Sequence, residues 1–113
     1  MKTVTERPSF QGDVCIRRIS TIPAGLTPAQ AEKGIYVIAH SETGHHHVVQ
    51  ERAAQMLIDQ TNSFIAYLDV AEPAVLEHLR SFDTHAPLAL PPGKYEIRRQ
   101  REHAPEGWRR AQD

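Results

Sequence analysis

The spacing of short apolar runs between turn residues constrains the fold of this chain more than any other feature. Runs rich in β-branched and aromatic residues recur at 14–19, 35–39, 63–70 and 94–101, and clusters of proline, glycine, asparagine and aspartate separate them. No segment repeats apolar residues with the 3.6-residue period of a long amphipathic helix. Short strands with such turn signals are typical of all-β domains. We therefore predict a small, mainly β domain, either a barrel or a sandwich, with one or two short helical turns.

Two of the predicted strands flank a turn and favour a hairpin over residues 35–49. Residues 35–39 are β-branched or aromatic, Ser41-Glu42-Thr43-Gly44 supplies turn formers, and residues 45–49 can continue as a strand. Near the other end of the chain, two sets of residues alternate along 94–101. One set is Tyr95, Ile97 and Arg99, and the other is Glu96, Arg98 and Gln100. This period of two predicts a strand with one solvated face. Glutamates interleave with its arginines, which favours that interpretation over a nucleic-acid patch.

Three other segments have mixed signals for helix and strand. Thr27 precedes a proline, which favours one helical turn over residues 28–33 with Thr27 as its N-cap and Gly34 as its end. Residues 52–57 contain good helix formers but are short. Residues 75–79 fit either a strand or one helical turn.

The length of 113 residues corresponds to one domain with a modest core. Residues 1–10 are polar and include a proline, so we expect a flexible N-terminal arm. Residues 11–103 then form a single β-rich domain. Residues 104–113 are polar apart from Trp108 and form a C-terminal tail. Trp108 either folds back onto the domain or stays exposed as an anchor for a partner.

Charge and hydropathy disfavour several classes of protein. The formal net charge of −1 argues against a globally basic nucleic-acid binder. No apolar run approaches the ~20 residues that cross a bilayer, so we expect no membrane contact. The first residues lack the apolar centre of a secretory signal, which favours a cytoplasmic location. Cys15 is the single cysteine and lies in an apolar run, which predicts a buried, inert thiol rather than a metal ligand or a nucleophile.

The segment Thr43-Gly44-His45-His46-His47 carries the clearest chemical signal. Imidazole is the commonest protein metal ligand, and three histidines in succession are unusual inside a chain. On a strand, His45 and His47 point to one face and His46 to the other. Glu51 has the same parity, and His85 and His78 lie in a later segment, so all three are further candidates. We therefore predict a site for zinc, nickel, manganese or iron with His45, His47, His85 and Glu51 as ligands. A solvated, histidine-rich hairpin tip is the competing interpretation.

The sequence leaves two classes of function open. A metal held by imidazoles and a carboxylate, with an open position, activates water or a carbonyl, so the first class includes an enzyme. Motifs for a nucleophilic serine, a zinc protease helix or a phosphate-binding loop are absent from the sequence. The second class is a non-catalytic accessory or adaptor protein that acts through a protein-protein surface. Either class is compatible with a homo-oligomer or with a separate protein partner.

Three segments match the motifs of one protein family. They are Gln11-Gly12-Asp13-Val14, the histidine segment 43–47, and a long final motif that runs from His85-Ala86-Pro87 through Pro92-Gly93-Lys94-Tyr95 to Arg101-Glu102. On these motifs the chain resembles a family of small, uncharacterised bacterial and phage-associated proteins, over nearly its whole length. The family's middle motif reads Gly-His-x-His, which matches His45 and His47. This resemblance implies a grouping and a phage association but no activity.

The spacing of His45, His47 and Glu51 also resembles the His-x-His-x₃-Glu motif of the cupins. The second cupin motif, Pro-x-Gly-x₂-His, matches Pro91-Pro92-Gly93-Lys94-Tyr95-Glu96 with glutamate in place of histidine. The glycines that flank both cupin motifs are missing. This resemblance implies a small β-barrel with metal bound by histidine and glutamate.

Overall fold

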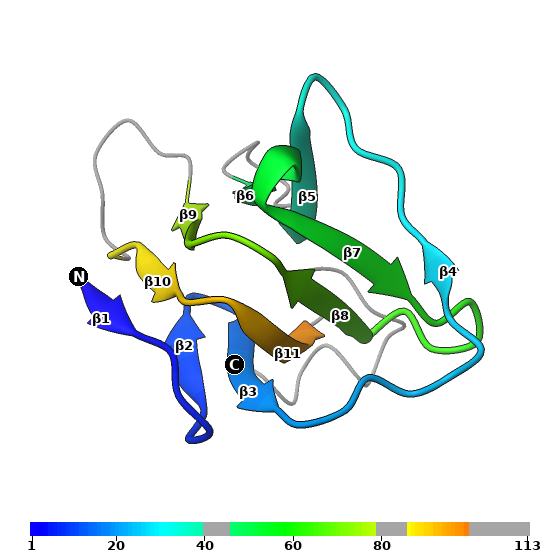
Figure 1. Ribbon diagram of the computed structural model, residues 1–113, viewed down its shortest axis with the longest axis horizontal. Coiled ribbons are helices and arrows are strands. Elements are labelled where there is room, and N and C mark those ends of the chain that lie inside the picture. Colours follow the sequence, from blue (N-terminus) through cyan, green and yellow to red (C-terminus); the bar gives the residue numbers. More distant parts are fainter. Residues whose placement is uncertain (40–45, 79–85, 100–113) are drawn as a thin grey trace, which may run out of the picture.

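The computed structural model describes residues 1–39, 46–78 and 86–99, and these residues form two β-sheets (Figure 1). The prediction of a mainly β fold is confirmed, and the described strands form a sandwich-like pair of sheets with no closed barrel. The strands are β1 (Lys2–Thr3), β2 (Ser9–Gln11), β3 (Val14–Ile19), β4 (Thr27–Pro28), β5 (Ile35–Ala39), β6 (His47–Gln50), β7 (Ala54–Ile58), β8 (Ile65–Val70), β9 (Ala74–His78), β10 (Leu88–Leu90) and β11 (Gly93–Arg99). A single 3-10 turn, η1 (Glu51–Ala53), is the one helical element of the described residues.

Both sheets combine strands that are far apart in the sequence. The five-stranded sheet has the order β1-β10-β9-β6-β5, and the six-stranded sheet has the order β2-β3-β11-β8-β7-β4. The pair β1–β10 is parallel, and the other described pairs are antiparallel. The predicted hairpin is confirmed, because β5 pairs antiparallel with β6 from Ile35 opposite Gln50 to Ala39 opposite His47.

The core lies between the sheets and is built by alternation along the strands. On β11, Tyr95 and Ile97 are fully buried, and Arg98 between Ile97 and Arg99 is exposed, as the period of two predicts. The neighbouring strands contribute the residues that face these two across the register. Three of them, Ile16 on β3 and Ala66 and Leu68 on β8, are fully buried, whereas the fourth, Arg18 opposite Tyr95, is half-buried.

The three segments with mixed signals all contain strands. Thr27–Pro28 forms β4 and pairs with Ile58 and Leu57 of β7, so the helical turn predicted from Thr27 is wrong. β4 is an edge strand and pairs with a neighbour on one side only. Proline is therefore tolerated there, because no second strand needs a hydrogen bond from the N–H that Pro28 lacks. Residues 52–57 are divided between η1 and β7, and residues 75–78 belong to strand β9.

The N-terminal segment is part of the sandwich, whereas we expected residues 1–10 to form a flexible arm. Lys2 and Thr3 pair with β10, and the N–H of Val4 donates to the carbonyl of Ala89 at 3.0 Å. Val4 is only 1% exposed, and Ser9 is buried in β2. One apolar side chain in a polar segment thus joins the core and orders the residues around it. The predicted tail, residues 104–113, lies outside the described residues.

Tyr95 fixes the passage of the chain from one sheet to the other. The chain leaves β10 in the five-stranded sheet and enters β11 in the six-stranded sheet after Pro91 and Pro92. The buried Tyr95 hydroxyl donates to the carbonyl of Pro91 at 2.5 Å, and burial raises the pKa of this phenol. A tyrosine that bonds to the backbone a few residues upstream is also the corner device of Greek-key sandwiches.

Replacement of Tyr95 by phenylalanine should lower the free energy of unfolding by about 1–2 kcal/mol, because the Pro91 carbonyl loses its donor while the ring stays packed. Urea denaturation measures this change. The matched control is Tyr36→Phe, which alters another buried strand tyrosine whose hydroxyl has no hydrogen bond within the described residues. Equal losses in the two variants would contradict a specific role for the Tyr95 hydroxyl.

Candidate functional site

A buried amide joins the two sheets near the predicted histidine site. Gln11 on β2 is 1% exposed, and its Nε2 donates to the carbonyls of Leu76 at 2.9 Å and Ala86 at 3.0 Å. Its Oε1 lies 2.8 Å from Nδ1 of His47, which is 6% exposed. Two carbonyl partners require the amide nitrogen on their side, so the amide oxygen faces His47. Because an amide oxygen only accepts, His47 carries its hydrogen on Nδ1 and donates to Gln11.

His47 stacks on a second histidine across the sheet. His47 and His78 are register partners on β6 and β9, and their ring centroids are 4.2 Å apart with an angle of 4° between the planes. The lone pair of a ring nitrogen lies in the plane of its ring. The lone pairs of two stacked rings therefore lie in two separate, parallel planes. The pair cannot converge on one ion unless one ring turns. In this geometry the stack joins two neighbouring strands, and the Gln11 bond then joins them to the other sheet.

The structure separates Glu51 from His47, the two predicted metal ligands that lie within the described residues. Glu51 is exposed at the start of η1, because strand β6 ends at Gln50 and the strand parity used in the prediction does not extend to residue 51. From His47 to Gln50 alone the strand advances about 10 Å, so Glu51 does not share a site with His47. His45 and His85 lie outside the described residues. Within the described residues, no group of three or more histidine, cysteine, aspartate or glutamate side chains is placed to hold a metal ion.

Replacement of Gln11 by leucine should lower the free energy of unfolding by about 2–3 kcal/mol. The variant keeps the side-chain bulk but leaves the partners of Gln11 on two strands and one loop without their hydrogen bonds. Gln50→Leu on the exposed end of β6 is the matched control and should change stability by less than about 0.5 kcal/mol. If thermal and urea unfolding show no difference between the two variants, Gln11 does not hold the sheets together.

The outer face of the six-stranded sheet collects polar and aromatic side chains in two adjacent rows. We define the outer face as the side chains of this sheet that point away from the core. The strand register places Arg17, Glu96 and Tyr67 side by side on β3, β11 and β8. The next row holds Phe10, Cys15 and Arg98 on β2, β3 and β11. Sequence analysis predicted a solvated face for Glu96 and Arg98 but had no signal that Arg17 and Phe10 join them.

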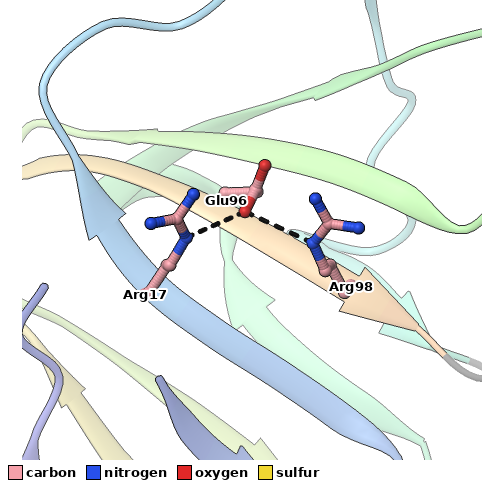
Figure 2. Close-up of polar contacts among 3 residues, drawn as sticks. All are labelled: Arg17, Glu96 and Arg98. Atoms are coloured by element: carbon pink, nitrogen blue, oxygen red, sulfur yellow. Dashed lines mark hydrogen bonds and ion pairs between the residues drawn. The ribbon is translucent and has the colours of Figure 1, made fainter. Parts of the chain in front are cut away.

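Two arginines share one carboxylate oxygen on this face (Figure 2). Oε1 of Glu96 lies 3.0 Å from Nε of Arg17, which donates a hydrogen bond to it, and 3.5 Å from Nε of Arg98. The Glu96 side chain is 11% exposed, whereas Arg17 is 46% and Arg98 is 60% exposed. The carboxylate is therefore covered, and the guanidinium groups reach solvent. Because both are well exposed, each ion pair stabilises the fold by less than about 1 kcal/mol.

An open groove of about 470 Å³ lies beside Arg17. Its floor includes the side of Tyr67, which is 9% exposed, and Glu96. The chain that leaves β3 forms one wall. The lining residues are Glu6, Arg17, Arg18, Ile19, Ser20, Thr21, Pro23, Tyr67 and Glu96. Arg18 uses its Nη2 to donate to the carbonyl of Pro92 at 2.9 Å, whereas the contact of Arg17 to Glu96 uses Nε and leaves its two Nη groups at the groove.

Comparison with known proteins assigns the chain to a family. Residues 10–100 match a family described as a domain of unknown function, DUF8820. The chain belongs to this family. No curated protein and no solved structure matches the chain. The matched region runs from β2 past the end of β11, so this DUF8820 domain includes Gln11, His47 and the outer face. Within the described residues of the domain, no helix has the length and apolar character of a membrane span.

Cys15 lies on the outer face of the DUF8820 domain rather than in its core. It is half-buried between the register positions of Phe10 and Arg98, whereas Val14 and Ile16 on either side are fully buried. Desolvation by burial raises the pKa of the Cys15 thiol, although Arg98 and Arg17 oppose the shift. The thiol is therefore protonated at neutral pH, which agrees with the predicted inert cysteine but not with its predicted place in the core.

Proposed function

We propose that this DUF8820 domain is an accessory or adaptor module that binds a partner protein on its outer face. The observation that carries the proposal is the side-chain composition of this face. Phe10 is 69% exposed and has Arg98 and Arg17 close by in the strand register. Exposed aromatic and arginine side chains are the residue types that contribute most to protein interfaces.

Rigidity of the face supports the same function. The outer face stands on paired strands, and β11 has neighbours on both sides. Glu96 restrains Arg17 and Arg98 through their Nε atoms, so less rotamer freedom remains to be lost when a partner binds. A surface ordered in advance binds more tightly for the same contacts.

The distribution of charge favours a protein partner over nucleic acid. Glu96 and the exposed Asp69 lie among the basic residues of the outer face, and these carboxylates repel a phosphate backbone. The second aromatic of the face, Tyr67, is buried and offers little ring surface for base stacking. The formal net charge of −1 points the same way.

Affinity capture followed by direct binding tests this function. Proteins retained by the tag-free, immobilised chain from its native cells are purified, and their affinity for the parent chain is measured by calorimetry. Phe10→Ser and Arg98→Ser should each weaken binding of a true partner by about tenfold or more, because each removes an anchor from the interface. Lys2→Ser, on the exposed edge of the other sheet, is the control and should bind as the parent does.

Partners that bind Phe10→Ser and Arg98→Ser as tightly as the parent would refute the proposal. Circular dichroism and unfolding of each variant confirm that the fold is retained.

We propose metal binding at the histidine end as a second candidate function. His47 donates from Nδ1 to an amide oxygen, which leaves Nε2 as its acceptor nitrogen, and metal-bound histidines have this arrangement. Gln11 also bonds to the carbonyl of Ala86, the residue after His85. Ala86, which follows His85, and His47, which lies two residues after His45, thus both bond to the side-chain amide of Gln11. These observations support zinc, nickel, manganese or iron held by His45, His47 and His85.

Calorimetric titration of zinc into untagged protein tests this second function. His45→Ala and His85→Ala should each weaken zinc binding by about tenfold or more, because each removes a ligand. His46→Ala is the control, since residue 46 precedes the strand residue that carries the site and has the opposite parity. His47→Ala is interpreted only with its unfolding curve, because His47 is buried. A parent that binds none of the four metals, or equal losses at all three positions, would exclude the site.

A further inference from the structure

We infer that Arg17 and the groove beside it form a carboxylate-binding site for an aspartate or glutamate side chain of the partner. This inference rests on the proposed partner-binding function and gives it a chemical specificity. Its basis is the arrangement of Arg17, Glu96 and Arg98, in which one carboxylate holds two guanidinium groups.

Glu96 restrains the arginines but leaves most of their donors available. Both contacts to Glu96 Oε1 use Nε, and Figure 2 shows the terminal nitrogens of Arg17 and Arg98 outside the two dashed contacts. Within the described residues, no other hydrogen bond or ion pair uses the side chain of Arg17 or Arg98. The two Nη groups of a guanidinium match the two oxygens of a carboxylate in spacing and plane. Arg17 therefore presents a restrained pair of donors at the wall of the groove.

The net charge of the cluster of Arg17, Glu96 and Arg98 favours a ligand with a single negative charge. Two guanidinium groups and one carboxylate leave one positive charge, which one incoming carboxylate neutralises. Glu6 and Glu96 both line the groove, and their charges oppose a doubly charged phosphate more strongly than a carboxylate. Carboxylate is thus the favoured anion.

The groove also supplies neutral donors beside Arg17. Ser20, Thr21 and Tyr67 line it, and each carries a hydroxyl group. The Tyr67 hydroxyl has no hydrogen bond to another residue within the described part of the chain, although its ring is buried. A phenol hydroxyl at the floor of the groove is a donor for a bound carboxylate oxygen.

The neighbouring row of the outer face indicates what accompanies the acidic residue. Phe10 lies one strand and about two residues away from Arg17, which is a Cα separation of about 8 Å. Residues two apart in an extended peptide are separated by about 7 Å. A partner segment with an acidic residue two positions from an aromatic residue therefore reaches Arg17 and Phe10 together.

Nuclear magnetic resonance titration with defined peptides tests the inference. The probe is a short extended peptide, acetylated and amidated, with Glu-Ser-Phe at its centre. The control peptide is identical except that it carries Gln-Ser-Phe. The parent chain should bind the glutamate peptide about tenfold more tightly, because a carboxylate accepts two charge-assisted hydrogen bonds from Arg17, whereas the neutral glutamine amide offers only one oxygen. The resonances of the Arg17 Nε–H, Tyr67 and Phe10 should shift during the titration.

Two variants test whether Arg17 is responsible. Arg17→Gln should abolish the preference for the glutamate peptide, and this exposed position tolerates the change without loss of the fold. Arg52→Gln, an exposed arginine of η1 that does not line the groove, should keep the full preference. Arg17→Lys should retain only part of it, because an ammonium group lacks the planar pair of donors.

Each outcome decides between the inference and its alternatives. Equal affinity for the two peptides, no binding at roughly millimolar concentration, or an unchanged preference in Arg17→Gln would overturn the carboxylate site. Inorganic phosphate that binds more tightly than the glutamate peptide would overturn it in favour of a phosphate site. If the peptides fail while partner binding still depends on Phe10 and Arg98, the inference is wrong and the proposed function stands. A glutamate preference that depends on Arg17, without any captured partner, supports the site alone.

Discussion

The alternation of side chains along β11 determines both the core and the candidate site of this domain. Tyr95 and Ile97 point inward and are fully buried, and Glu96 and Arg98 point outward from the same strand. Because β11 pairs with β3 and β8 over most of its length, its register sets which residues of those strands face the core. A slip of one residue would exchange the two faces, placing a carboxylate among apolar residues and a tyrosine in solvent. Burial of the apolar set therefore fixes the arrangement of the outer face.

The two candidate functional regions differ in how much they contribute to the stability of the fold. Gln11 and His47 are buried, and their hydrogen bonds hold strands of both sheets, so the contribution of this region to stability is direct. Arg17 and Arg98 are half-exposed and contribute little to stability. Loss of a buried polar group disturbs the whole fold, whereas loss of an exposed arginine leaves it intact. Substitutions of these exposed arginines on the outer face therefore leave the fold intact.

Local sequence patterns predicted the strands whose residues alternate or are β-branched, including residues 35–39 and 94–99. They failed at Thr27-Pro28, where signals typical of a helix N-terminus belong to an edge strand. They also failed at residues 1–10, because the burial of Val4 depends on β10 and not on its sequence neighbours. The prediction of Glu51 as a ligand relied on its strand parity with His45 and His47, but the strand ends at Gln50 and Glu51 begins the turn η1.

By itself, the sequence determined the class of fold, because the period of two and the turn residues act over a few neighbouring positions. It also determined which types of side chain are available to form a site, such as the run of histidines and the arginines interleaved with glutamates. Tertiary structure alone decided which of them meet. Arg17 and Glu96 are 79 positions apart, and His47 and Gln11 are 36 apart. Such pairs come together only through the register of strands from distant parts of the chain, and that register follows from the burial of the shared core.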